Sequence, residues 1–181
     1  DALAGIILSA SHNPGGIDGD FGVKLNVSNG GPAPEYLTNK IYKCSRTLTC
    51  YKIFEESIPD INYLSSFQVN DMEVEVIDGL NDYVLLLENI FDFDRIAEFI
   101  KNDYSIIFDA MSAVTGPYAT KIFVEKFGLS EDCVMNGTPL QDFGKLHPDP
   151  NLTYAKTLAD LLLNKKTYNF GAACDGDGDR N

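Results

Sequence analysis

Basic residues are scarce in this chain. Lys and Arg number 14 against 27 Asp and Glu in 181 residues, which gives a formal net charge of -13. Proteins that bind nucleic acid or anionic membranes broadly need a basic surface, so the composition argues against both as partners. An acidic protein can still bind a phosphorylated ligand if it gathers a metal ion and a few cations in one cleft.

Long apolar runs and paired cysteine motifs are also missing. No apolar run approaches the roughly 20 residues of a membrane-spanning helix, so we expect no membrane span. The four cysteines form no Cys-x-x-Cys pair, and reduced thiols in a cytoplasmic protein are the better interpretation. The chain lacks an initial Met and stops inside an acidic loop. We therefore expect a fragment of a longer protein, with the remaining domains of that protein as partners.

Apolar patterning predicts an α/β protein. Short apolar or alternating runs are typical of strands, and they cover residues 5–10, 72–77, 105–110, 133–135 and 170–174. We expect the first of these strands to be buried and the second to be half-exposed. Strands that alternate with helices imply a layered α/β architecture whose sheets are mixed but mostly parallel.

Helices are expected where apolar residues recur every three or four positions. Pro34 stands where one helix would begin, and Asn81 and either Asp92 or Asp94 are the expected caps of two more. Two further helices cover residues 117–127 and 154–163.

Residues 46–72 give weak, mixed signals, and we expect irregular connections there. A domain boundary is placed near residue 91. It divides the chain into residues 1–91 and residues 92–181.

Residues 174–181, the acidic loop, read Cys-Asp-Gly-Asp-Gly-Asp-Arg-Asn. Glycines separate the three carboxylates and permit the backbone angles that turn them toward one centre. Oxygen ligands of this kind suit Mg²⁺, which binds a few carboxylates together with a substrate phosphate. Three crowded anions also need a cation to offset their repulsion. The loop therefore predicts a Mg²⁺ site at Asp175, Asp177 and Asp179, beside an Arg180 able to bind a phosphate in two places.

Other interpretations of the acidic loop stay open at this point. Asp and Gly also favour plain surface turns. An EF-hand requires Gly at the sixth position of its loop, where Arg180 stands. A haloacid-dehalogenase-type phosphatase also places Asp-x-Asp after a strand, as at Asp175 and Asp177, but usually carries Thr or Val where Asp179 stands. From the acidic loop alone, that phosphatase is the serious rival.

Residues 10–16, the serine loop, read Ala-Ser-His-Asn-Pro-Gly-Gly and follow the first apolar run. A nucleophilic or phosphorylated hydroxyl needs exposure, amide donors and a group that handles its proton, and Ser11 could obtain all three here. Taken alone, Ser11 would more simply be a turn serine and His12 a structural histidine. Ser11 and Asp175 both come just after the carboxyl end of a strand, the edge where open α/β sheets bind ligands. Two such edges facing each other would form an interdomain cleft.

Several motifs in order along the chain resemble the α-D-phosphohexomutase superfamily. After the serine loop come Gly-Asp-Phe-Gly-Val-Lys at residues 19–24 and Asn-Gly-Gly-Pro-Ala-Pro-Glu at residues 29–35. Asn-Ile-Phe-Asp-Phe at residues 89–93, His-Pro-Asp-Pro-Asn-Leu-Thr-Tyr-Ala at residues 147–155 and Gly-Ala-Ala at residues 171–173 extend the match to the acidic loop. The resemblance spans essentially the whole chain and is nearest to the eukaryotic phosphoglucomutases, parafusin-like proteins included. It implies parts of two consecutive phosphohexomutase-type α/β domains.

The resemblance implies a role for each candidate residue. Ser11 would be the phosphoserine that donates and recovers the phosphoryl group, and its phosphate oxygen would complete the Mg²⁺ site of the three aspartates. His12 and Lys24 would also be catalytic, through proton handling near the phosphoserine. Substrate and phosphate contacts would come from Asn13, Lys24 and Arg180. Lys24 could act as an acid or base if nearby cations lower its pKa.

The implied activity is that of a phosphoglucomutase, an intramolecular phosphotransferase acting on a phosphosugar. Phospho-Ser11 would interconvert glucose 1-phosphate and glucose 6-phosphate through glucose 1,6-bisphosphate, which is both intermediate and activator. The chain alone is expected to be inactive, since the sugar-reading and distal phosphate loops would lie in further domains. Two alternatives remain: a mutase for another phosphohexose, and a parafusin-like phosphoprotein in regulated secretion.

The sequence departs from the family pattern at two places. Ser9 stands where Thr is common, and residues 109–113 read Asp-Ala-Met-Ser-Ala where Asp-Ala-Met-His-Gly is usual. The second change puts in doubt any contact that this loop makes across the cleft.

Overall fold

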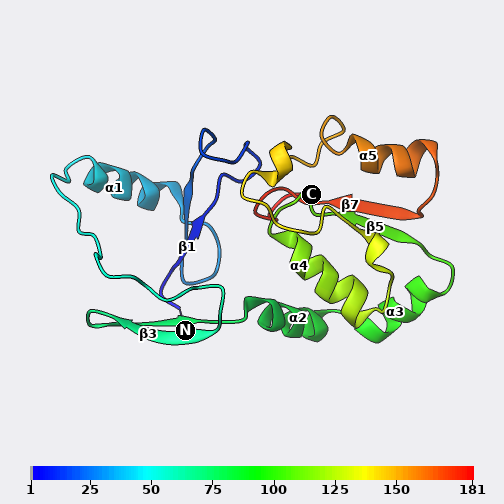
Figure 1. The fold of residues 1–181 in the computed structure, drawn as a ribbon, viewed down its shortest axis with the longest axis horizontal. Helices are drawn as coiled ribbons and strands as arrows, with labels where there is room; N and C mark the ends of the chain where they lie inside the picture. The colour runs from blue at the N-terminus through cyan, green and yellow to red at the C-terminus, as the bar shows by residue number, and fades with distance from the viewer. Residues whose placement is uncertain (1) are drawn as a thin grey trace.

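The structure, a computed structural model, describes residues 2–181 and has two halves that lie side by side (Figure 1). The first half contains two antiparallel strand pairs, β1 (Gly5–Leu8) with β2 (Val23–Asn26) and β3 (Ser65–Val69) with β4 (Met72–Val76). Two helices accompany them: α1 (Glu35–Ser45), which begins after Pro34, and α2 (Gly79–Ile90), which leads into the second half.

The second half is built around a parallel sheet with the strand order β6-β5-β7. The central strand β5 (Ile106–Asp109) lies between β6 (Val134–Met135) and β7 (Phe170–Ala173). Its helical elements are, in chain order, α3 (Phe93–Lys101), α4 (Thr115–Ala119), the π-helix η1 (Thr120–Lys126), the 3-10 helices η2 (Glu131–Cys133) and η3 (Phe143–Lys145), α5 (Lys156–Ala159) and the π-helix η4 (Asp160–Asn164). Because β5 and β7 run parallel, their carboxyl ends lie at one edge, where β7 passes into the acidic loop.

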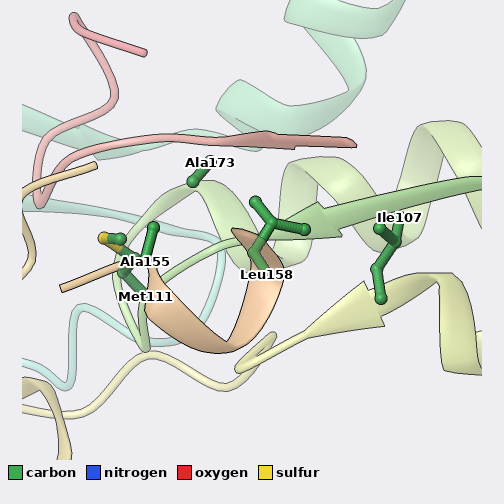
Figure 2. Close-up of a cluster of buried hydrophobic side chains, with 5 residues drawn as sticks. All are labelled: Ile107, Met111, Ala155, Leu158 and Ala173. Atoms are coloured by element: carbon green, nitrogen blue, oxygen red, sulfur yellow. The ribbon is translucent and has the colours of Figure 1, made fainter. Parts of the chain in front are cut away.

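A cluster of buried side chains joins the parallel sheet to α5 (Figure 2). It consists of Ile107, Met111, Ala155, Leu158 and Ala173. Burying a side chain of the size of Leu or Ile contributes about 1.5–3 kcal/mol, so this packing fixes β7 in place. The acidic loop begins one residue after Ala173 and therefore starts from a rigid strand.

The mixed α/β class predicted from the sequence is confirmed, but parallel pairing is confined to the second half. Both strand pairs of the first half are antiparallel because no crossover helix separates their strands. The expectation of a buried first strand is wrong. Ile6 and Leu8 are 70% and 66% exposed, since β1 carries no covering layer among residues 2–181.

Helix starts and one strand also differ from expectation. The cap of α2 is Asp78 rather than Asn81, because the Asp78 carboxylate accepts hydrogen bonds from the N–H groups of Leu80 and Asn81. Asp92, one of two predicted caps, does cap α3. β3 was not predicted: it lies within residues 46–72, expected to be irregular, and pairs with β4, which was predicted as a strand. The proposed boundary near residue 91 falls between α2 and α3 and stays a prediction.

The cysteines are free thiols, as expected: Cys44, Cys50, Cys133 and Cys174. Burial raises the pKa of Cys133 and of Cys174, which keeps both thiols protonated at neutral pH. Across residues 2–181, the helices are all too short or too polar to cross a membrane.

Candidate active site

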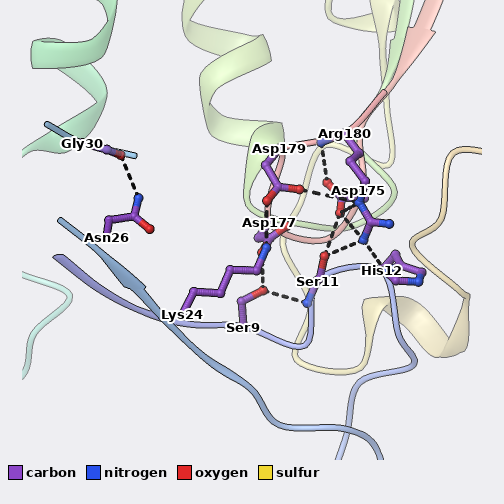
Figure 3. Close-up of polar contacts among 10 residues, drawn as sticks. All are labelled: Ser9, Ser11, His12, Lys24, Asn26, Gly30, Asp175, Asp177, Asp179 and Arg180. Atoms are coloured by element: carbon purple, nitrogen blue, oxygen red, sulfur yellow. Dashed lines mark hydrogen bonds and ion pairs between the residues drawn. The ribbon is translucent and has the colours of Figure 1, made fainter. Parts of the chain in front are cut away.

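Two loops from opposite ends of the chain meet at the candidate site (Figure 3). The serine loop follows β1, and the acidic loop follows β7. Hydrogen bonds of Ser11 with Asp175 and Arg180, 164 and 169 positions away along the chain, join the two loops. The site therefore needs both halves of the chain.

Ser11 is held in an unusual backbone conformation with its hydroxyl between two charged groups. Its φ of 59° lies in the left-handed region, which costs of the order of 1–3 kcal/mol for a residue other than Gly. Its N–H donates to Ser9 Oγ at 2.8 Å. Its hydroxyl donates to Asp175 Oδ2 at 3.1 Å and accepts from Arg180 Nη2 at 2.6 Å. The oxygen thus faces a carboxylate on one side and a guanidinium on the other.

The three aspartates of the acidic loop offer carboxylate oxygens within 4.8 Å of one another. Gly178, with a φ of 78°, makes the turn between them, and its N–H donates to the Asp175 carbonyl oxygen at 3.1 Å. Asp175 is completely buried, and Asp177 Oδ1 is buried without a hydrogen-bond partner in residues 2–181. A buried oxygen without a partner is costly, and a cation bound there would offset that cost. The cluster therefore fits a divalent cation that prefers oxygen ligands, such as Mg²⁺.

Lys24, on β2, brings a cation to this cluster. Its Nζ lies 2.5 Å from Asp177 Oδ2 and 2.7 Å from Asp179 Oδ2. The hydrogen bonds to Asp177 and then to Asp179 raise the pKa of Lys24 above its ordinary value. Burial raises the pKa of Asp177, but the hydrogen bonds from Lys24 and Ser9 outweigh it and leave that pKa lowered. Lys24 is therefore a positive charge here, and it must leave these carboxylates before it can act as a base.

Arg180 links the acidic loop to the serine loop. Its backbone N–H and its Nε donate to the two carboxylate oxygens of Asp175, at 3.1 and 3.2 Å. Its Nη2 also contacts His12 Nδ1. Figure 3 shows Lys24 and His12 on either side of Ser11.

Close packing fixes how the two loops lie against each other. A Cβ at Gly176 would collide with the carbonyl oxygen of Ser11 and would lie 3.2 Å from the Phe143 ring and 3.3 Å from Pro148 Cγ. Pro148 is itself fully buried. The acidic loop can therefore approach Ser11 this closely only with Gly at position 176.

The structure brings the sequence-predicted candidates together: Ser11, His12, Lys24, Asp175, Asp177, Asp179 and Arg180. Asn13 follows His12 in the serine loop, and its N–H donates to the Ala10 carbonyl oxygen at 3.1 Å. The catalytic, phosphate-binding and metal-binding roles assigned to these residues stay predictions.

Ser9 was noted in the sequence only as a departure from the family pattern, with no role at the site assigned to it. Its hydroxyl accepts from the Ser11 N–H and donates to Asp177 Oδ2 at 2.7 Å. The signal in the sequence is a second hydroxyl two positions before Ser11, which by itself does not say that it faces Asp177.

Residues 109–113, where the sequence departs from the family pattern, are buried rather than forming an exposed surface. Ser112 and Ala113 are 7% and 1% exposed. The Ser112 N–H donates to the Asn136 carbonyl oxygen, and the Ser112 carbonyl oxygen accepts from the Leu140 N–H, both at 2.9 Å. Ser112 thus connects the end of β5 to the segments after β6.

Comparisons with known proteins find a family and close relatives. Residues 81–181 match the family described as phosphoglucomutase/phosphomannomutase, alpha/beta/alpha domain II, and residues 1–52 match domain I of the same description. The chain is 49% identical to a phosphoglucomutase of Rhizobium radiobacter, over 99% of this chain and 33% of that protein. It is 51% identical to phosphoglucomutase-1 of Dictyostelium discoideum, over 99% of this chain and 32% of that protein. The chain thus spans about a third of the length of these curated relatives.

A solved structure agrees with this similarity. The exocytosis-sensitive phosphoprotein pp63/parafusin (phosphoglucomutase) from Paramecium, in its open form, matches with a TM-score of 0.85 at 42% identity. The match covers 97% of this chain and 34% of that one. Sequence and fold therefore agree over nearly all of the chain.

Proposed function

Because the chain belongs to the phosphoglucomutase/phosphomannomutase family, we propose that the protein containing it interconverts glucose 1-phosphate and glucose 6-phosphate. Relatives named phosphoglucomutase support this choice of sugar. The observation that carries the proposal is the position of the Ser11 hydroxyl, between the Asp175 carboxylate and the Arg180 guanidinium. A hydroxyl in this position can carry a phosphoryl group beside the acidic loop, whose carboxylates fit a cation.

In the proposed reaction, phospho-Ser11 transfers its phosphoryl group to the free hydroxyl of a glucose monophosphate. The bond from phosphorus to Ser11 Oγ breaks, a bond to the sugar oxygen forms, and the sugar hydroxyl gives up its proton. The product is glucose 1,6-bisphosphate, which also serves as activator. The reverse transfer from its other phosphate restores phospho-Ser11 and releases the isomeric monophosphate.

His12, Lys24 and Arg180 support this transfer in the proposal. Arg180 already donates to Ser11 Oγ, so its guanidinium is placed to bind phosphoryl oxygens in a forked arrangement. His12 and Lys24, on either side of Ser11, handle the exchanged protons. Asn13, which follows His12 in the serine loop, contributes to phosphate binding.

The carboxylates of Asp175, Asp177 and Asp179 would hold Mg²⁺, with a phosphate oxygen on Ser11 completing the site. When bound, the ion would neutralise negative charge on the transferring phosphoryl group. Lys24 and Arg180 leave one of the three carboxylate charges unbalanced, which favours a further cation. The proposal is completed by a phosphosugar as substrate and by the further domains of a longer protein as partners. A cytoplasmic location is also proposed, and the four free thiols support it.

A second function is favoured by one observation. The Paramecium relative of similar fold is described as an exocytosis-sensitive phosphoprotein. A role as a phosphoprotein in regulated secretion is therefore the alternative, either beside mutase activity or in place of it. Measured turnover separates these two cases.

The test uses the full-length protein with Mg²⁺ and a trace of glucose 1,6-bisphosphate. We expect conversion of glucose 1-phosphate to glucose 6-phosphate, faster than conversion of mannose 1-phosphate, and abolished by a chelator or by Ser11→Ala. A folded protein without turnover on glucose 1-phosphate would refute the proposal. Phosphate release that survives Ser11→Ala but not Asp175→Asn would instead support the phosphatase alternative.

A further inference from the structure

We propose that Ser9 is a positioning residue that ties the serine loop to the acidic loop and fixes the orientation of Asp177 toward a bound cation. Its hydroxyl is the group that contacts both the backbone of Ser11 and the side chain of Asp177. The effect on turnover rests on the proposed function, whereas the effect on cation binding does not.

Backbone pairing holds Ser9 in place independently of the contacts that its side chain makes. Its N–H donates to the Gly22 carbonyl oxygen at 3.0 Å, which extends the pairing of β1 with β2 by one residue. The Ser9 hydroxyl therefore projects from the end of a paired strand. A group built on such an element keeps its direction better than one on an unpaired loop.

The Ser9 hydroxyl makes two hydrogen bonds of opposite direction. It accepts from the Ser11 N–H at 2.8 Å and donates to Asp177 Oδ2 at 2.7 Å. A carboxylate only accepts and an amide N–H only donates, so neither role can be reversed. This fixes the hydroxyl proton toward Asp177 and a lone pair toward Ser11.

At Asp177 the consequence is an oriented carboxylate. Oδ2 accepts from Ser9 and lies 2.5 Å from Lys24 Nζ, whereas Oδ1 is buried without a partner in the described chain. The hydrogen bond from the neutral Ser9 hydroxyl to Oδ2 sets the rotation of the carboxylate and leaves Oδ1 for a cation, whereas the charge of Lys24 competes with that cation. Partners of this kind behind a metal ligand typically contribute about 10- to 100-fold to affinity or activity.

At Ser11 the consequence is a stabilised backbone. The φ of 59° is unfavourable for serine, and the bond from the Ser11 N–H to Ser9 helps to hold it. The predicted nucleophile and a predicted metal ligand therefore depend on one hydroxyl. A change at Ser9 should disturb both together.

The test compares Ser9→Thr with Ser9→Val in the full-length protein, because these side chains have the same shape and differ in the hydroxyl. Mn²⁺ is the probe, and its free concentration is followed by electron paramagnetic resonance. We expect Ser9→Thr to bind Mn²⁺ within about twofold of wild type and Ser9→Val to bind it about tenfold more weakly. In the mutase assay, Ser9→Val should lower kcat by a similar factor with little change in KM.

Ser105→Ala is the matched control. The Ser105 hydroxyl donates to Asn169 Oδ1 at 2.9 Å and accepts from the Asn169 N–H at 3.3 Å. Both residues stand at the amino ends of the parallel strands β5 and β7, opposite the edge where the acidic loop begins. Its loss should leave Mn²⁺ affinity unchanged. Equal affinities for Ser9→Val and Ser9→Thr would overturn the proposal, as would the absence of a Mn²⁺ site sensitive to Asp177→Asn. A protein without sugar turnover that still shows the expected Mn²⁺ pattern would refute the mutase and retain the role of Ser9.

Discussion

Replacing Lys24 with Met should move metal affinity and turnover in opposite directions. Lys24 Nζ pairs with both Asp177 Oδ2 and Asp179 Oδ2. A divalent cation at these aspartates must either displace the ammonium or sit beside it. Both cases disfavour the bound cation, so removal of the charge should tighten metal binding. Turnover should fall, because Lys24 is a proposed catalytic residue.

The size of the effect follows from exposure. The Lys24 side chain is 36% exposed, and Asp177 and Asp179 are 10% and 57% exposed. Exposed ion pairs contribute about 0.2–1 kcal/mol each after solvent screening, so two pairs give about 1 kcal/mol, or roughly a fivefold gain in metal affinity. The carboxylates raise the pKa of Lys24 above its ordinary value. The stabilisation from a raised pKa is fully present below the ordinary lysine pKa, so an assay at neutral pH measures all of it.

Titration calorimetry of Mg²⁺ into the full-length protein measures the affinity, and the coupled assay of glucose 6-phosphate measures the turnover. Lys121→Met is the control, because Lys121 forms a comparable ion pair with Glu125 at 2.6 Å on the helical segment η1. That control should change neither quantity. Weaker Mg²⁺ binding in folded Lys24→Met would refute the reasoning, since Lys24 would then support the metal rather than compete with it.

Two further substitutions test the packing around the site. Gly176→Ala should separate the loops, because its Cβ would collide with the Ser11 carbonyl oxygen. We expect at least a tenfold loss of turnover in a folded protein, of the order seen when catalytic groups move by an ångström. Normal turnover would contradict this, since it would show that the loops can shift apart without effect. Leu158→Ala should lower the free energy of unfolding by about 2–5 kcal/mol, because Leu158 is 5% exposed in the buried cluster that packs against β7. Chemical denaturation measures this loss. A loss below about 1 kcal/mol would contradict the place of Leu158 in the hydrophobic core.

The parts of the fold that the sequence predicted well are those whose signals are local. The second-half strands follow from apolar runs, and the N-cap of α3 follows from Asp92 next to a helical pattern. The cap of α2 was misplaced because Asp78 and Asn81 both suit a helix start, and the choice depends on which side chain reaches the open N–H groups. The exposure of β1 was not predictable, since an apolar run does not say whether a covering layer is present.

For the candidate site too, the residues that the sequence predicted are those with a local signal. Ser11 and the aspartates were predicted because each motif has a residue type and spacing suited to its chemistry. Ser9 was missed because its role depends on a contact across 168 positions of sequence. The raised pKa of Lys24 was also not predictable, since the ion pairs with Asp177 and Asp179 exist only after the two loops meet.

The central claim is that the phosphoryl group resides on Ser11 during the reaction. Its most direct test exposes the full-length protein to glucose 1,6-bisphosphate carrying labelled phosphate, with Mg²⁺, and locates the label by peptide mapping. The account predicts label on Ser11 that unlabelled glucose 1-phosphate removes. Label on Asp175, or a folded protein that takes up none, would contradict it.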